Sequence, residues 1–217
     1  MNIRRTISRL LRRNESENYI KRMRKCGVSI GEGTRIFDPT TTLIDTQNPH
    51  MLSIGKNVRI TKGCIVLTHD YSWSVLAGVY GEILGGVGKV EIGNNVFIGM
   101  NSIILKDTSI GDNVIIGAGS VIKGKIESDS VYAGNPAKRI MSLDEFYEKR
   151  KAKQLVELDE IKRQYKIRYG KDADEKATIE YFWQYWERSR PLSKDVEGLI
   201  ERTGYAEKIR KKFYDLD

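Results

Sequence analysis

The chain has 217 residues, a net charge of +8, 40% hydrophobic residues, two cysteines and two histidines. This length fits one domain with an appendage, and no apolar run approaches the roughly 18 residues that span a membrane. Two scattered thiols make neither a disulfide framework nor a zinc motif, so the composition favours a reducing cytoplasm.

Residues 1–27 form a basic N-terminal segment. Residues 1–25 hold nine Lys or Arg and two acids, which is +7 of the net charge, and charges occupy the place of a signal peptide's apolar region. Ile3, Ile7, Leu10 and Leu11 recur at helical spacing between arginines, which predicts a short basic helix. Two alternatives stay open for it: packing on the main body, or peripheral contact with the inner membrane surface. Nucleic-acid binding is not expected, because no recognition motif or aromatic platform accompanies the charge.

Within residues 28–140 aliphatic residues recur with a period of six, in two runs. The series is Ile30, Ile36, Ile54, Ile60, Val66, and then Ile92, Ile98, Ile104, Ile110, Ile116 and Ile122. A six-residue unit is a short strand plus a corner, and three units close a coil of 18 residues. Glycine often follows the aliphatic residue, which we interpret as permitting the backbone angles of a tight turn. The period predicts a parallel β-helix with an all-β core, and poor matches at Thr42 and Asn48 predict an irregular first coil.

Between Val66 and Ile92 the repeat shifts by two positions, so the chain leaves the coil and returns. The excursion covers about residues 70–89 and is rich in glycine and aromatic residues. A loop extruded from a rigid scaffold usually carries function, which predicts a site beside it.

Residues 141–217 have a different composition and predict an α-helical C-terminal extension. Apolar residues of 143–169 recur at near-helical spacing. For the aromatic stretch Tyr181–Trp186, packing in a helical cap is the expectation and a sugar platform is the alternative.

Three stretches resemble a known family: Ile110–Val121, the tail Val131–Lys138, and Leu67-Thr68-His69-Asp70. They are similar to the hexapeptide-repeat acyltransferases, in the branch of maltose, galactoside and polysaccharide O-acetyltransferases. The resemblance covers about residues 28–140. It implies a left-handed coil, a homotrimer with sites between neighbouring coils, acetyl-CoA as the donor, a saccharide acceptor and a role in polysaccharide biosynthesis.

Acetyl transfer to a hydroxyl needs a base, and histidine suits neutral pH. The chain offers His50 and His69. His69 lies just before the excursion, where the catalytic histidine of the similar families falls, so it is the predicted base. Its orienting partner is not identified, since Asp70 is adjacent in the strand and should face the other way.

Four further residues are expected to bind the acceptor. Asp45 lies near the place where similar enzymes hold an acceptor-binding carboxylate, with solvated turn aspartate as the alternative. Asp70, Tyr71 and Trp73 begin the excursion, and the two aromatic side chains could stack on a sugar face.

The resemblance also implies that CoA lies along the later coils. Its contacts would be Met100, Ala118, Lys123 and Lys138, with the lysines meeting phosphates. At Lys123-Gly124 this chain departs from the Thr-Lys common in the family. No metal site is expected, because a carbonic anhydrase with this coil needs three histidines on zinc.

The acceptor stays open. An antibiotic acetyltransferase, a nucleotide-sugar N-acetyltransferase and a non-catalytic β-helix scaffold are the alternatives to sugar O-acetylation.

Overall fold

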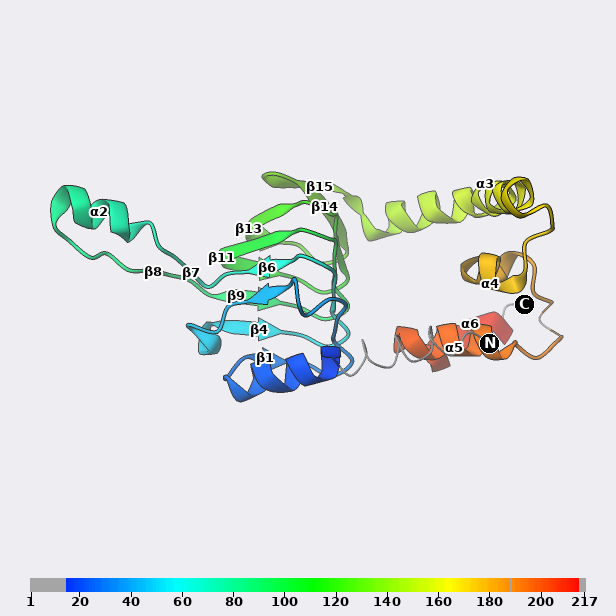
Figure 1. Cartoon of the computed structure of the whole chain (residues 1–217), viewed down its shortest axis with the longest axis horizontal. Coiled ribbons are helices and arrows are strands. Elements are labelled where there is room, and N and C mark those ends of the chain that lie inside the picture. Colours follow the sequence, from blue (N-terminus) through cyan, green and yellow to red (C-terminus); the bar gives the residue numbers. More distant parts are fainter. Residues whose placement is uncertain (1–14, 188, 215–217) are drawn as a thin grey trace. The chain divides into compact units, whose positions relative to one another are not determined.

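The computed structural model describes residues 15–187 and 189–214, and Figure 1 shows its helices and strands. The chain divides into two compact units, Met1–Phe146 and Tyr147–Asp217. The predicted helix through Ile3 and Leu11 lies outside the described residues. Among those described, no helix is long and apolar enough to cross a membrane.

The first unit is a parallel β-helix, as the six-residue period predicts. Its strand pairings make three columns, and several of the strands are visible as parallel arrows in Figure 1. The first column holds β1 (Ser29–Ile30), β4 (Leu52–Ile54), β9 (Val90–Ile92) and the second halves of β11 (Ile103–Ile110) and β13 (Val121–Ile126). The second holds β2 (Arg35–Ile36), β5 (Arg59–Ile60), β10 (Phe97–Ile98), β12 (Val114–Ile116) and β14 (Ser130–Gly134). The third holds β3 (Leu43–Ile44), β6 (Ile65–Val66) and the first halves of β11 and β13.

The predicted aliphatic residues form the core of this coil. In the second column Ile36, Ile60, Ile98 and Ile116 stack in register and are fully buried. Each such side chain contributes about 1.5–3 kcal/mol by leaving water. In the first coil Ile44, and not Thr42, pairs with Val66. Two extra residues before Ile44 and four more before Ile54 make that coil irregular. The last strand, β15 (Ala137–Ser142), runs antiparallel to β14 and ends the stack.

The repeat glycines have a different role from the predicted one. Gly31, Gly55, Gly93 and Gly111 are not among the residues with positive φ. Instead, a Cβ atom on Gly93 would lie 2.6 Å from the carbonyl oxygen of Gly111 on the next coil. These glycines are therefore required by the close approach of successive coils, and the prediction of special turn angles was wrong for them.

Asparagine supplies the left-handed backbone at the corner between the first and second columns. Asn57, Asn95, Asn113 and Asp129 have φ between 54° and 57°, a region that Asn and Asp tolerate better than most residues. The Asn95 side-chain amide donates to Asn113 Oδ1 at 2.8 Å, and Asn113 donates to Asp129 Oδ1 at 2.9 Å. The outward polar residues of the repeat thus form a ladder that ties coil to coil.

A helix over residues 15–25 packs on the first coil. Its Tyr19, Ile20 and Met23 are buried in the same hydrophobic core as the coil. The Tyr19 hydroxyl donates to the carbonyl of Thr42 at 3.2 Å and accepts from the backbone N–H of Ile44 at 3.3 Å. This part of the predicted segment 1–27 therefore packs on the main body and covers the open end of the hydrophobic stack.

The second unit is helical, as predicted. Helix α3 (Leu143–Tyr169) begins in the first unit, and is followed by α4 (Glu175–Thr178), η2 (Ile179–Gln184), α5 (Lys194–Thr203) and α6 (Ala206–Tyr214). Phe182, Val196, Ile200 and Phe213 form a small buried core. Trp183, Tyr185 and Trp186 pack against it, so the aromatic stretch is packed within this unit.

The stacking role of glycine makes a stability prediction. Gly93→Ala places a methyl group within 2.7 Å of the Gly111 backbone, and we expect a loss of about 3 kcal/mol or more. Gly78→Ala is the matched control, because its Cβ would meet nothing within 4 Å and it lies inside helix α2 (Trp73–Tyr80). We expect that variant to be as stable as the parent or slightly more so. Urea unfolding followed by circular dichroism compares them, and equal midpoints would contradict the stacking argument.

Candidate active site

The predicted excursion is a two-stranded ribbon that carries a helix. Strand β7 (His69–Asp70) pairs antiparallel with β8 (Gly86–Val87), and α2 lies between them. In Figure 1 this segment extends from the coil and bears α2 at its end. Because the ribbon starts at His69, it fixes the backbone of the predicted base.

The His69 imidazole pairs with Asp45. Its Nδ1 lies 2.7 Å from Asp45 Oδ2. Asp45 follows β3 in the first coil, and His69 follows β6 in the second. The predicted base therefore has an orienting carboxylate, which sequence reasoning had left unidentified.

Asp45 is buried and held by several donors. Its Oδ2 accepts from the Thr68 hydroxyl and from the Thr68 backbone N–H at 3.0 Å, and its Oδ1 accepts from the Gln47 N–H at 2.8 Å. Burial alone would raise the pKa of Asp45, but the hydrogen bonds from Thr68, Gln47 and His69 outweigh burial and hold that pKa at about 2. The side chain is therefore a carboxylate at neutral pH.

The charge of Asp45 determines where the proton sits on His69. A carboxylate only accepts hydrogen bonds, so Nδ1 must donate. In the neutral imidazole this leaves Nε2 with a free lone pair. The His69 side chain is 25% exposed, whereas that of Asp45 is 6% exposed. The histidine is thus partly exposed while its carboxylate partner is buried.

Asp70 makes different contacts from its neighbour. Its carboxylate forms an ion pair with Lys106 Nζ at 2.7 Å and accepts from the Ser72 N–H at 3.1 Å. These contacts, with Lys106 first, hold the pKa of Asp70 well below its ordinary value. His69 pairs with Asp45, whereas its neighbour Asp70 pairs with Lys106. The two adjacent side chains thus have different partners, as the alternation along a strand predicts.

Two aromatic residues of the excursion, exposed Tyr71 and half-buried Trp73, lie side by side. The rings of Tyr71 and Trp73 lie 4.4 Å apart between centroids and are tilted by 49°. Tyr71 is 67% exposed. Tyr71 and Trp73 follow His69 by two and four positions. An exposed aromatic ring therefore lies near the predicted base along the chain.

The predicted CoA contacts lie on the later coils. Met100 and Ala118 occupy equivalent corners of successive coils, and the N–H of Gly119 donates to the Met100 carbonyl at 2.7 Å. A Cβ on Gly119 would meet nothing within 4 Å, so this corner is open. Lys123 on β13 and Lys138 on β15 are exposed. Among the described residues, none of these four forms a hydrogen bond or an ion pair with His69.

Sequence reasoning missed two residues around the base. Thr68 is fully buried and donates twice to Asp45. Lys106 pairs with Asp70 from the third coil. Thr68 occupies the position two residues after the stacked Val66, and a polar residue at that place was the signal available for it. For Lys106 the sequence carried no signal, because the contact depends on the path of the excursion.

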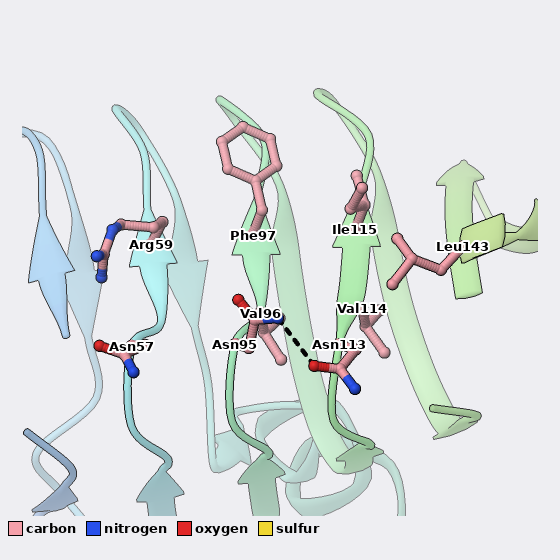
Figure 2. A pocket seen from close by; sticks show the side chains of 9 residues that line it. All are labelled: Asn57, Arg59, Asn95, Val96, Phe97, Asn113, Val114, Ile115 and Leu143. Atoms are coloured by element: carbon pink, nitrogen blue, oxygen red, sulfur yellow. Dashed lines mark hydrogen bonds between the residues drawn. The ribbon is translucent and has the colours of Figure 1, made fainter. Parts of the chain in front are cut away.

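A groove of about 250 Å³ lies on the outer face of the second column. Figure 2 shows Arg59, Phe97, Ile115 and Leu143 along it, with the asparagine ladder at one side. Arg59 is the one charged residue in its lining, and an arginine does not serve as a base. None of the predicted site residues lines this groove. Among the described residues, no group of three His, Cys, Asp or Glu could hold a metal ion.

Comparisons with known proteins agree with the repeat. The family model for bacterial transferase hexapeptide (six repeats) matches residues 89–124. Protein CapG of Staphylococcus aureus is 40% identical over 132 residues, which are 61% of this chain and 74% of that protein.

Two solved structures are also similar. A maltose O-acetyltransferase from Clostridium difficile 630 is 26% identical, with a TM-score of 0.44, over 64% of this chain and 83% of that chain. A galactoside acetyltransferase in complex with coenzyme A is 28% identical, with a TM-score of 0.39, over 53% of this chain and 55% of that chain. With its repeat matched by the family model and most of CapG covered at 40% identity, the chain belongs to the bacterial hexapeptide-repeat transferase family.

Proposed function

We propose that this protein is an acetyltransferase that moves an acetyl group from acetyl-CoA to a hydroxyl of a sugar or polysaccharide precursor. The observation that carries the proposal is the His69–Asp45 pair at the base of the excursion. Membership of a transferase family supports group transfer. The donor and the acceptor class are those that the resemblance of the sequence implies, as is the left hand of the coil.

The pair can perform the proton transfers of this reaction. His69 Nε2 takes the proton of the acceptor hydroxyl as the oxygen attacks the thioester carbonyl carbon. The tetrahedral intermediate then collapses, the C–S bond breaks, and the CoA sulfur leaves with the proton that the imidazolium returns. Asp45 stabilises the imidazolium between these steps, because it is ionised and hydrogen-bonded to Nδ1.

Asp45 is better assigned to His69 than to the acceptor. Both of its oxygens already accept internal hydrogen bonds, and 7% of the residue is exposed. The expected acceptor-binding carboxylate is therefore replaced in this proposal by a positioning carboxylate. Tyr71 and Trp73 remain the proposed acceptor platform, since their rings are paired and Tyr71 is exposed.

The proposed path of CoA follows the later coils. The open corner beside Met100 and Ala118 leaves room for the pantetheine arm near the backbone. The exposed ammonium groups of Lys123 and Lys138 are suited to phosphates.

An amine acceptor would use the same base, so an antibiotic or a nucleotide sugar with a free amine stays as the second candidate. A screen of acetyl-CoA consumption against sugars, amino sugars and antibiotics separates these acceptors. A purely scaffolding protein has no need of a buried carboxylate aimed at a solvent-facing histidine.

The role of His69 is tested by His69→Ala with His50→Ala as the control. We expect His69→Ala to lower turnover ~10²–10⁴-fold, the usual cost of losing a general base. CoA affinity and melting temperature should stay close to the parent, because His69 is no part of the aliphatic stack. His50 is exposed in η1 (Pro49–Met51), and its variant should remain active. If His50→Ala is the inactive protein, the base is assigned wrongly.

The role of Asp45 is tested by Asp45→Asn, which keeps the shape and removes the charge. An amide can donate to Nδ1 and so favours the wrong tautomer, and we expect turnover to fall ~10²-fold or more. The parent should also lose stability in acid. The pKa of Asp45 is about 2 in the folded chain and 3.8 ordinarily, so its stabilisation is full above pH 4 and is lost as pH falls towards 2.

That acid-dependent contribution amounts to about 2 kcal/mol. Urea unfolding at pH 6 and pH 2.5 measures it in the parent and in Asp45→Asn. The difference between the two proteins should shrink at the lower pH. A constant difference would show that the Asp45 charge is not stabilised by the fold.

We also propose a homotrimer, as the resemblance implies. Exposed apolar side chains support association: Phe37 and Leu43 are 50% and 51% exposed on the outer faces of the coil, and Val75 and Val79 are each 67% exposed on α2. Light scattering should give about three times the chain mass of 24.8 kDa. A monomer at working concentration would contradict shared sites.

A further inference from the structure

A lysine from the third coil holds the strand that bears the proposed base. Lys106 Nζ lies 2.7 Å from Asp70 Oδ2, and Asp70 is the residue after His69 in β7. Lys106 belongs to β11, which is separated from β7 along the chain by the whole excursion. The ion pair thus joins the start of the excursion to the coil that follows it.

Asp45 and Lys106 therefore bind neighbouring residues of β7. Asp45 of the first coil holds His69 through Nδ1 and Thr68 through its hydroxyl and N–H. Lys106 of the third coil holds Asp70. Adjacent residues of a strand point in opposite directions, so Asp45 and Lys106 restrain β7 from its two sides.

The returning strand passes over the ion pair. A Cβ on Gly86 would lie 2.8 Å from Lys106 Nζ and 2.9 Å from Asp70 Oδ1. Gly86 pairs with Asp70 across the ribbon, and the N–H of Gly88 donates to the Thr68 carbonyl at 2.8 Å. The absence of a side chain at Gly86 lets the lysine, the aspartate and β8 meet at one point.

Asp70 also binds the residue that precedes α2. Its Oδ1 accepts from the N–H and the hydroxyl of Ser72 at 3.1 Å and 2.5 Å. Ser72 is the residue before α2, whose first residue is Trp73. Through the Asp70 carboxylate, Lys106 therefore restrains both β7, which bears His69, and the first turn of α2.

The pair is poorly suited to a purely stabilising role. The side chains of Lys106 and Asp70 are 23% and 40% exposed, and ion pairs at such a surface add little to stability. Its geometry, in contrast, bears directly on the residue next to it in the chain.

We propose that Lys106 is a positioning residue for His69, acting through Asp70 to hold β7 so that the imidazole meets Asp45 with Nδ1. This inference rests on the proposed function of His69, but its first test does not require acetyl transfer. Without Lys106, Asp70 Oδ2 loses its partner and β7 is anchored from one side. The imidazole then occupies several orientations, and the tautomer set by Asp45 is no longer uniform.

The first experiment observes the two imidazoles directly. Protein labelled with ¹⁵N at histidine contains two rings, those of His50 and His69, and His50→Gln assigns them. The ¹⁵N shifts of the neutral ring report which nitrogen carries the proton. The variants are Lys106→Met, Lys106→Arg and the isosteric Asp70→Asn, and the matched control is Lys125→Met, an exposed lysine of β13 outside the proposed machinery.

In the parent, His69 should carry its proton on Nδ1. Lys106→Met and Asp70→Asn should give averaged ¹⁵N shifts for His69 and unchanged shifts for His50, with melting temperatures near that of the parent. Lys106→Arg and Lys125→Met should retain the parent spectrum. If Lys106→Met does not fold, Asp70→Asn decides the matter. The proposal is overturned if His69 keeps its Nδ1 proton in the folded Asp70→Asn, or if Lys125→Met alters His69 equally.

The second experiment uses turnover once an acceptor is identified. A misplacement of about 1 Å costs up to ~10²-fold in rate, so Lys106→Met should lower kcat about 10- to 100-fold and leave KM for acetyl-CoA unchanged. In a His69→Ala background the same substitution should have no further effect. An additive loss, or a rise in KM alone, would overturn the positioning role. A protein that shows the expected spectra but transfers no acetyl group would refute the proposed function. It would still support the role of Lys106 in positioning His69.

Discussion

The structure depends on how closely one coil stacks on the next. Parallel strands of neighbouring coils lie at the usual hydrogen-bonding spacing of about 4.8 Å, and at the glycine corner this leaves no room for a methyl group. A Cβ on Gly55 would lie 2.4 Å from the Gly93 carbonyl oxygen. The same short distance between coils aligns the aliphatic side chains. It also lets the Asn95 side-chain amide donate a hydrogen bond to Asn113 Oδ1. Any longer insertion must therefore leave at a corner, as the excursion does after His69.

Stacking also assembles the candidate site from residues that are distant in sequence. Asp45 and His69 are 24 positions apart and come from successive coils, and Lys106 comes from the third. Each is held by its own coil, so the relative places of carboxylate, imidazole and ammonium are set before any substrate binds. Rigid elements are the more accurate supports for such a constellation.

The sequence predicted the fold through periodicity and failed where contacts depend on irregular backbone. The six-residue series identified three strands per coil and the excursion, and near-helical spacing after residue 143 identified the helical end. It did not identify the partner of His69, because two extra residues before Ile44 shift Asp45 out of the repeat. The repeat glycines were identified, but their role was predicted wrongly. Asn57 and its equivalents, and not these glycines, adopt the left-handed backbone angles. The regular spacing predicts which aliphatic residues stack, but it does not predict contacts between residues that lie outside the repeat.

The irregular first coil holds the buried carboxylate of Asp45. Leaving water opposes ionisation of Asp45, and the donors that outweigh this come from Thr68, Gln47 and His69. The Gln47 N–H donates to Oδ1 two residues along the same turn. The longer turn through η1 thus provides a backbone donor, the second coil provides Thr68, and one acceptor position on Oδ2 is left for the imidazole. A carboxylate satisfied in this way stays charged and fixed, and its remaining hydrogen bond determines which nitrogen of His69 carries the proton.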